Sequence, residues 1–207
     1  MPEKKHNLAW PILPALAASL LLQAPVTRGD GPTEFELTGE YSHRGADSCI
    51  PCHQESMPLS AMAIFGTPHA ALDDPRSPFG QLQCESCHGP GKDHARSQRG
   101  GGDVPPTVSF GNRAATPATE QNAVCLGCHE SHGRLGWFGS RHEARQVPCA
   151  ACHQIHRSKD RVFDALAQQE ACFGCHERRR ADTFRSSNHP LRFGSMACSS
   201  CHDPHAV

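Results

Sequence analysis

The chain contains six copies of C-x-x-C-H, in which two cysteines about one helical turn apart are followed at once by a histidine. This spacing places two thiols and one imidazole on a single short turn, where they can attach to or bind one common group. The six copies use every cysteine: Cys49, Cys52 and His53; Cys84, Cys87 and His88; Cys125, Cys128 and His129; Cys149, Cys152 and His153; Cys172, Cys175 and His176; Cys198, Cys201 and His202.

Disulfides, zinc and haem could each use paired cysteines, and the histidine distinguishes them. A disulfide does not need it, and a zinc site made of four thiolates does not need an imidazole directly after the second thiol. A c-type haem needs this order, because both thiols form thioethers to the porphyrin and the next residue becomes the proximal iron ligand. The sequence therefore predicts six covalently bound haems c, with the six motif histidines as proximal ligands.

A second set of histidines follows a longer period of three units. Each unit has an odd-numbered motif, then Ser or Thr two residues before a histidine, then an even-numbered motif with a trailing histidine. The additional histidines equal the haems in number, and we expect them to be the distal iron ligands: His69, His94, His142, His156, His189 and His205. A histidine three residues after a proximal ligand cannot reach the other face of the same haem, so His156 should bind a neighbouring iron.

Three histidines remain outside this scheme. His6 lies in the N-terminal segment, whereas His43 and His132 are expected to be surface residues or partners of haem propionates. His132 is the stronger rival ligand, because it lies three residues after His129, the same offset that His156 shows. Methionine is an alternative iron ligand, and the chain offers Met57, Met62 and Met196.

The composition predicts an unusual interior. Aromatic residues make up 6% of the 207 residues, while Gly and Pro number 18 and 17. Such a chain would bury too little of its own apolar surface to offset its conformational entropy. We expect the porphyrins to form the core, inside a fold that is mostly coil with short α-helices around a chain of six haems and little or no β-sheet.

The N-terminus is typical of a secretory signal. Lys4 and Lys5 precede an apolar run at residues 8–22, and small or polar residues follow to residue 31. The run is shorter than the roughly 20 residues of a transmembrane helix. We expect residues 1–29 to be a signal peptide cleaved between residues 24 and 30, and the mature chain to be exported.

The exported part is expected to be one hexahaem domain at residues 30–207. Its two-haem units should span about 41–95, 120–157 and 165–207, with a flexible linker rich in Gly and Pro at about 96–119. A short helix is predicted at residues 160–170. From residue 30 onward, 17 Lys and Arg oppose 20 Asp and Glu, a balance that does not favour nucleic-acid binding.

Four stretches resemble a known family: Cys84–Ala95, Trp137–Glu143, Cys172–His176 and Cys198–His205. They are similar to periplasmic decahaem cytochromes that sit inside an outer-membrane porin, and to their relatives in extracellular dimethyl sulfoxide reduction. The pentahaem electron donors of periplasmic nitrite reductase are more distant relatives. The resemblance implies low-potential haems with two histidine ligands each, although six motifs occur here instead of ten.

These observations favour an electron-transfer protein and not an enzyme, because every predicted iron has two histidine ligands. The resemblance implies a location in the periplasm or at the outer membrane. The expected partners are periplasmic or inner-membrane cytochromes on one side, and an outer-membrane porin, surface cytochrome or terminal reductase on the other. The alternatives are a soluble periplasmic shuttle to a terminal reductase and a multihaem enzyme of the nitrite reductase or hydroxylamine oxidoreductase type.

Overall fold

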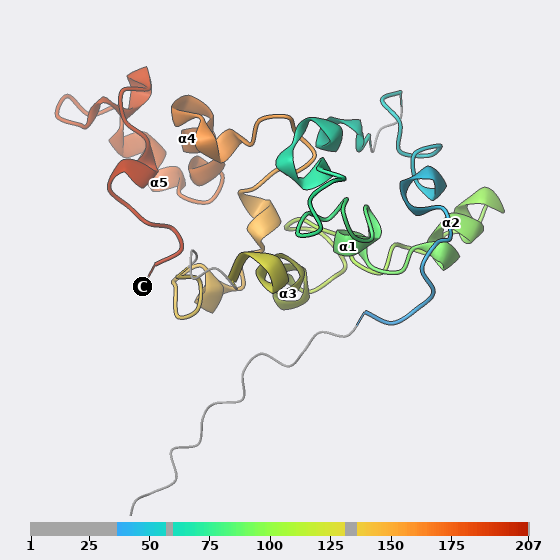
Figure 1. The fold of residues 1–207 in the computed structure, drawn as a ribbon. Coiled ribbons are helices and arrows are strands. Elements are labelled where there is room, and N and C mark those ends of the chain that lie inside the picture. The colour runs from blue at the N-terminus through green and yellow to red at the C-terminus, as the bar shows by residue number, and fades with distance from the viewer. Residues whose placement is uncertain (1–36, 57–59, 131–135, 207) are drawn as a thin grey trace, which may run out of the picture. The chain divides into compact units, whose positions relative to one another are not determined.

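The chain folds into short helices joined by coil (Figure 1). The computed structural model describes residues 37–56, 60–130 and 136–206, all within one compact unit. The α-helices in these ranges are α1 (Glu85–His88), α2 (Lys92–Arg99), α3 (Ala118–His129), α4 (Ala165–Phe173) and α5 (Glu177–Asp182). The described residues contain no strand, so the expectation of short helices, abundant coil and little sheet is confirmed. The predicted signal peptide, Met57 and His132 lie outside these residues.

Short 3₁₀ helices precede, separate and follow the α-helices. They are η1 (Gly45–Ser48), η2 (Met62–Gly66), η3 (Pro68–Ala70), η5 (Glu143–Arg145), η6 (Cys149–Ala151), η7 (Arg161–Phe163), η8 (Pro190–Phe193) and η9 (Cys198–Ser200). Single turns of this kind need little side-chain packing, which suits a chain with few apolar residues. None of the described helices is both long enough and apolar enough to span a bilayer.

The helix predicted at residues 160–170 is present but divided. Asp160 caps η7, and Asp164 then caps α4 by accepting hydrogen bonds from the backbone N–H groups of Leu166 and Ala167 at 3.1 and 3.0 Å. A side chain that satisfies the first N–H groups favours a new helix start at that point. The result is a 3₁₀ turn followed by a helix that continues to Phe173 in the fifth motif.

Few apolar side chains of the described residues are buried: Ala46, Phe79, Val108, Leu126, Trp137 and Phe173. These residues are scattered along the chain, so burial at this scale supplies only a modest part of the stabilisation that a domain of this size needs. This small core agrees with the expectation that another group fills the interior.

Buried or half-buried amide side chains hold the two motifs of a unit together. In the second unit, Asn122 on α3 accepts a hydrogen bond from the Cys149 N–H at 2.8 Å and donates to the Val147 carbonyl at 3.0 Å. In the third, Gln168 on α4 accepts from the Ser199 N–H at 3.0 Å. In the first, Gln83 accepts from the Ala46 N–H at 2.6 Å. Each amide therefore fixes one motif against its neighbour.

The segment expected to be a linker packs in part against the first unit. Its first residues belong to α2, and Val108 within it is fully buried. Gly89, which follows α1 with a φ of +69°, allows this approach, because a Cβ there would lie 3.1 Å from Leu37 and 3.2 Å from Thr107. Gln121 on α3 holds the other end by accepting from the Gly111 N–H at 2.9 Å.

Candidate haem sites

Every motif forms one helical turn. In five of them the histidine N–H donates to the carbonyl of the first cysteine, at 3.2 Å for His53, 3.0 Å for His88, 2.9 Å for His153 and His176, and 3.0 Å for His202. The remaining motif, Cys125–His129, is the last turn of α3. The i to i+4 turn brings both thiols and the imidazole to one local site, as attachment of a single haem requires.

The first cysteines of the two motifs in each unit are neighbours. The Cys49 thiol donates a hydrogen bond to Cys84, which raises the pKa of Cys49 and lowers that of Cys84. In the second unit, the Cys125 thiol likewise donates to Cys149, which raises the pKa of Cys125 and lowers that of Cys149. Burial and then the charge of Cys198 raise the pKa of Cys172 to about 11.

The second cysteines make the corresponding contacts between units. Cys128 contributes to the raised pKa of Cys87, and Cys175 contributes to that of Cys152, although burial is the larger cause in both cases. The cysteine neighbours therefore connect the six motifs in chain order. No disulfide joins any of the twelve cysteines, all of which lie in the described residues.

Five motif histidines each face a second histidine. The ring centroids are 6.4 Å apart for His53 and His94, 6.1 Å for His129 and His69, 6.1 Å for His88 and His156, 6.2 Å for His176 and His142, and 6.0 Å for His153 and His205. Each second histidine belongs to the predicted distal set. Four of the five pairs connect different units.

The separation of these rings fits one metal ion between two imidazoles. Two imidazoles that bind opposite faces of an ion, with metal–nitrogen bonds of about 2.0 Å, have ring centres roughly 6 Å apart. Aromatic rings in direct contact have centroids about 4.5–7 Å apart, so the distance alone fits both arrangements. The repeated pairing of a motif histidine with a member of the predicted distal set favours the ion. No cluster of three or more potential ligand side chains occurs in the described residues, so the histidines gather as pairs.

Hydrogen bonds at Nδ1 orient several of these imidazoles. Nδ1 of His88 lies 2.9 Å from the Val108 carbonyl, that of His94 lies 2.7 Å from the Val104 carbonyl, and that of His142 lies 2.8 Å from the Pro204 carbonyl. A carbonyl accepts only, so each Nδ1 carries the proton and leaves Nε2 with a lone pair. Metal-binding histidines usually have this second partner.

His153 has a carboxylate as its Nδ1 partner. Asp160 Oδ2 lies 2.7 Å from His153 Nδ1, while Oδ1 accepts from the Gln154 N–H at 3.2 Å and from the Val162 N–H at 3.4 Å. The three contacts fix the carboxylate, whose side chain is 16% exposed. A carboxylate partner makes an imidazole a stronger electron donor to a bound metal.

Burial also keeps several paired histidines neutral. It is the largest cause of the lowered pKa values of His69, His88, His156 and His205. The facing imidazole contributes for His69, His156 and His205, whereas His53 and His94 contribute for His88. A neutral imidazole retains the lone pair that a metal needs, because protonation would occupy Nε2.

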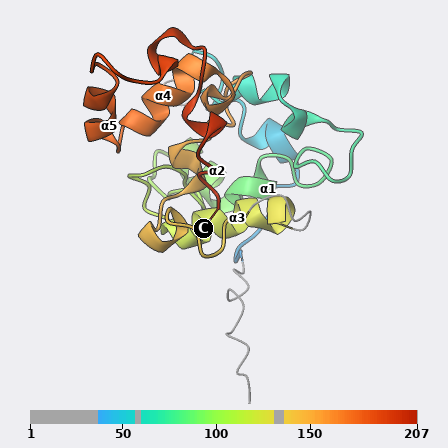
Figure 2. The ribbon, with the colours of Figure 1, turned by 90° about the vertical axis from the view of Figure 1, so that its left-hand side faces the viewer.

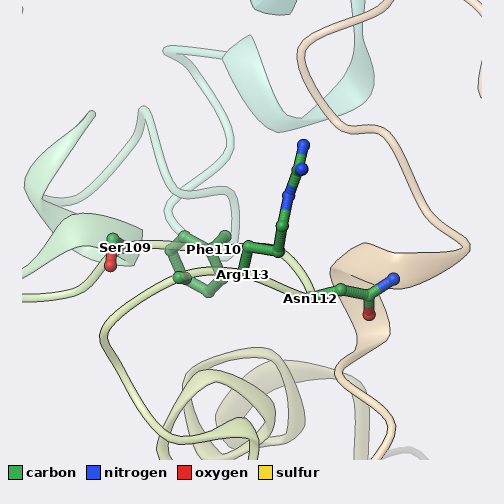
Figure 3. Close-up of a pocket in the computed structure, with 6 residues that line it drawn as sticks. Ser109, Phe110, Asn112 and Arg113 are labelled. Carbon is green, nitrogen blue, oxygen red and sulfur yellow. The ribbon is translucent and has the colours of Figure 1, made fainter.

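Two aromatic residues enclose paired histidines. Phe110 meets the His88 ring edge-on at 5.2 Å, and it belongs to the loop that lines the pocket at residues 109–114 (Figure 3). The buried Trp137 lies 6.0 Å from the His205 ring. His205 reaches this position because the C-terminal segment returns to the coil around residue 136, as both ribbon views show (Figures 1 and 2).

The remaining predicted ligands are not paired in this way. His189 and His202 are both exposed, and within residues 37–56, 60–130 and 136–206 no histidine ring faces either of them. Among the described residues, no pair of facing histidines includes His43. The residues that sequence reasoning missed are Val108, Phe110, Trp137 and Asp160, which surround ligands without belonging to any repeat.

Comparison with known proteins identifies the class of protein to which the chain belongs. The family model for cytochrome c-type protein NrfB-like matches residues 84–165, and that for cytochrome c3 matches residues 141–207. The chain is 33% identical over 158 residues to the cytochrome c-type protein NrfB of Haemophilus influenzae, covering 65% of this chain and 67% of the relative. It therefore belongs to the multihaem c-type cytochromes, whose cofactor is covalently bound haem c. The family resemblance noted in the sequence is confirmed.

A second relative has a higher identity. The chain is 42% identical over 167 residues to the multiheme cytochrome MtrA of Shewanella baltica, which covers 81% of this chain and 48% of that protein. The chain thus spans about half the length of this relative. The NrfB of Escherichia coli is 28% identical over 163 residues, covering 76% of this chain and 78% of the relative.

Replacing Asp160 should change the reduction potential of one haem. In Asp160→Asn the shape of the side chain remains, but the charge that strengthens His153 as a donor is lost, and one acceptor oxygen is left for the three N–H groups that the carboxylate serves. We expect one potential to rise by on the order of 50 mV, since a charge-assisted hydrogen bond differs from a neutral one by about 1 kcal/mol. Spectroelectrochemical titration of the holoprotein measures this shift.

Asp73→Asn is the matched control, because Asp73 is exposed in the turn that follows η3 and is not next to a proposed iron ligand in the sequence. Its potentials should match those of the wild type. Identical titrations for both variants would show that Asp160 has no influence on the haem bound by His153.

Proposed function

We propose that the chain transfers electrons along a row of six c-type haems. All twelve cysteines form thioethers, the six motif histidines are the proximal ligands, and the six histidines of the second set are distal ligands. The facing imidazole pairs are the observation that carries this proposal, since five independent pairs have the spacing that an iron requires. Membership in the multihaem cytochromes supports it.

The facing rings support a specific assignment of distal ligands. His94 is assigned to the iron of His53, and His156 to that of His88. The other assignments are His69 to the iron of His129, His205 to that of His153, and His142 to that of His176. The lowered pKa values and the Nδ1 hydrogen bonds support the same pairs, because they leave Nε2 available.

The cysteine neighbours support a continuous row. Within a unit, the first cysteines of the two motifs are neighbours. Between units, the second cysteines of consecutive motifs are neighbours. Together these neighbours connect motif one to motif six without a gap. Haem c, when bound, supplies one-electron chemistry between ferric and ferrous iron. The protein orients four of these imidazoles through Nδ1: His88, His94 and His142 through backbone carbonyls, and His153 through Asp160.

Electron transfer is favoured over catalysis by the ligand pairs. An enzyme needs an iron position where substrate can bind, and at five sites a second imidazole takes that position. We therefore propose an electron carrier located in the periplasm. Its partners are redox proteins: a periplasmic or inner-membrane cytochrome on one side and an outer-membrane porin with a surface cytochrome on the other. The resemblance to porin-bound cytochromes and the 42% identity to MtrA support this choice.

The haem count can be tested on the purified holoprotein. We expect its mass to exceed that of the polypeptide by six haems after acid–acetone extraction, because thioethers survive this treatment. A reductive titration should take up six electrons per molecule. Extractable haem, bound zinc or fewer than six electrons would contradict the proposed cofactor content.

Replacing His156 tests the ligand assignment. In His156→Ala all six haems should remain attached, since the thioethers do not depend on this residue. The iron of His88 should lose its distal ligand, so one further haem becomes high-spin and its potential rises. Electron paramagnetic resonance and ligand titration measure both effects.

His132→Ala is the matched comparison, because His132 has the same offset from its motif but lies outside the three-unit period. We expect its spectrum to equal that of the wild type. If only the His132 variant gained a high-spin haem, the assignment of His156 would be wrong.

The proposed partner predicts where the protein is found. A conduit should co-purify from detergent-solubilised outer membranes with a β-barrel protein, in a constant molar ratio. Recovery of the entire holoprotein in the soluble periplasmic fraction would favour the shuttle instead.

A further inference from the structure

The contacts between units have a direction. In the first two units, the histidine that precedes the even-numbered motif faces an odd-numbered motif of the following unit: His69 faces His129, and His142 faces His176. The proximal histidine of the even-numbered motif also faces forward. His88 faces His156 of the second unit, and His153 faces His205 of the third.

The second cysteine of each even-numbered motif follows the same rule. Cys87 neighbours Cys128 of the second unit, and Cys152 neighbours Cys175 of the third. Each of the first two units thus has three groups that contact the next unit. All six of these groups are half-buried: His69, Cys87, His88, His142, Cys152 and His153.

The third unit has three groups at the equivalent positions, and they differ in exposure from those of the first two units. His189, Cys201 and His202 occupy the equivalent sequence positions, and all three are exposed. Among the described residues, no imidazole faces either histidine. Here we call these three residues the forward face.

The first unit differs at its opposite side. Its odd-numbered proximal histidine and its trailing histidine would both contact a preceding unit under the same rule. Instead His53 and His94 face each other at 6.4 Å. The backward side of the first unit is therefore closed, and it offers no free ligand for the forward face of a second molecule.

We propose that the iron bound by His202 has an open sixth position in this chain and takes an imidazole from a further two-haem unit of the same plan. His189 is the reciprocal ligand, which binds an iron of that unit. This inference rests on the proposed function, in which these histidines are iron ligands.

The ligand classes favour a further unit over a second copy of the chain. Irons of even-numbered motifs receive trailing histidines in both resolved cases, His156 and His205. All three trailing histidines of this chain already face a proximal histidine, so a second copy has none to give. Of the predicted distal set, a second copy could offer only His189, which belongs to the class that faces odd-numbered motifs.

The surroundings of His189 suit a covered surface. Phe184 and Phe193, on either side of it in sequence, are 65% and 79% exposed. The Arg192 guanidinium lies over both rings, at 4.6 and 5.9 Å from their centroids. Large apolar side chains this exposed are typical of surfaces that another group or protein covers.

The test is the spin state of the holoprotein of this 207-residue chain. We expect one haem of six to be high-spin, to bind carbon monoxide when reduced, and to become low-spin when imidazole is added. His189→Ala and His132→Ala should both leave the number of high-spin haems at one. His156→Ala, as the positive control, should raise it to two.

Other outcomes would overturn the inference. Six low-spin haems in a monomer would mean that the chain supplies its own sixth ligand, and the variant that then gains a high-spin haem, His189→Ala or His132→Ala, would identify it. Six low-spin haems in a dimer, with one turning high-spin on dilution, would make a second copy the occupant. Fewer than six bound haems would instead contradict the proposed function, which separates the two failures.

Discussion

The pairing of imidazoles across an iron-sized gap is the constraint on which the remaining structure depends. The described residues bury few apolar side chains, so hydrophobic burial alone cannot determine how distant segments meet. A facing pair such as His88 and His156, which we propose to be ligands of one iron, does so directly, because it requires two parts of the chain at one point. Four of the five pairs connect different units, and the units are thereby interlocked.

Contacts within a unit have a different physical character. Asn122 and Gln168 join neighbouring motifs through buried amide hydrogen bonds, each with a modest net contribution to the free energy of unfolding. Their role is to set the distance between motifs whose first cysteines are neighbours. Amide side chains therefore position the two motifs inside a unit, whereas facing imidazoles connect one unit to the next. Loss of one imidazole should therefore loosen two units without detaching a haem.

The local features could be predicted from the sequence, because their causes are local. Each C-x-x-C-H turn follows from its own spacing, and the absence of sheet in the described residues follows from a chain rich in Gly and Pro. The distal set could be proposed from its period, but not its pairing, which depends on how units pack. Asp160 and Val108 could not be found, since a hydrogen bond to a proximal imidazole leaves no repeating signal. The supposed linker was assigned from composition, which does not reveal that Val108 is buried.

The equality of six proximal and six additional histidines is weaker support for internal closure than it first suggests. If every unit gives two ligand contacts to the next, any number of units has as many distal as proximal histidines. The numbers of distal and proximal histidines are equal whether each pair lies within one unit or joins one unit to the next. Only the ends distinguish these cases, and the ends differ: His53 and His94 face each other, whereas His189 and His202 do not. A balanced count is therefore a property of the repeat, while the availability of an iron is a property of its boundary.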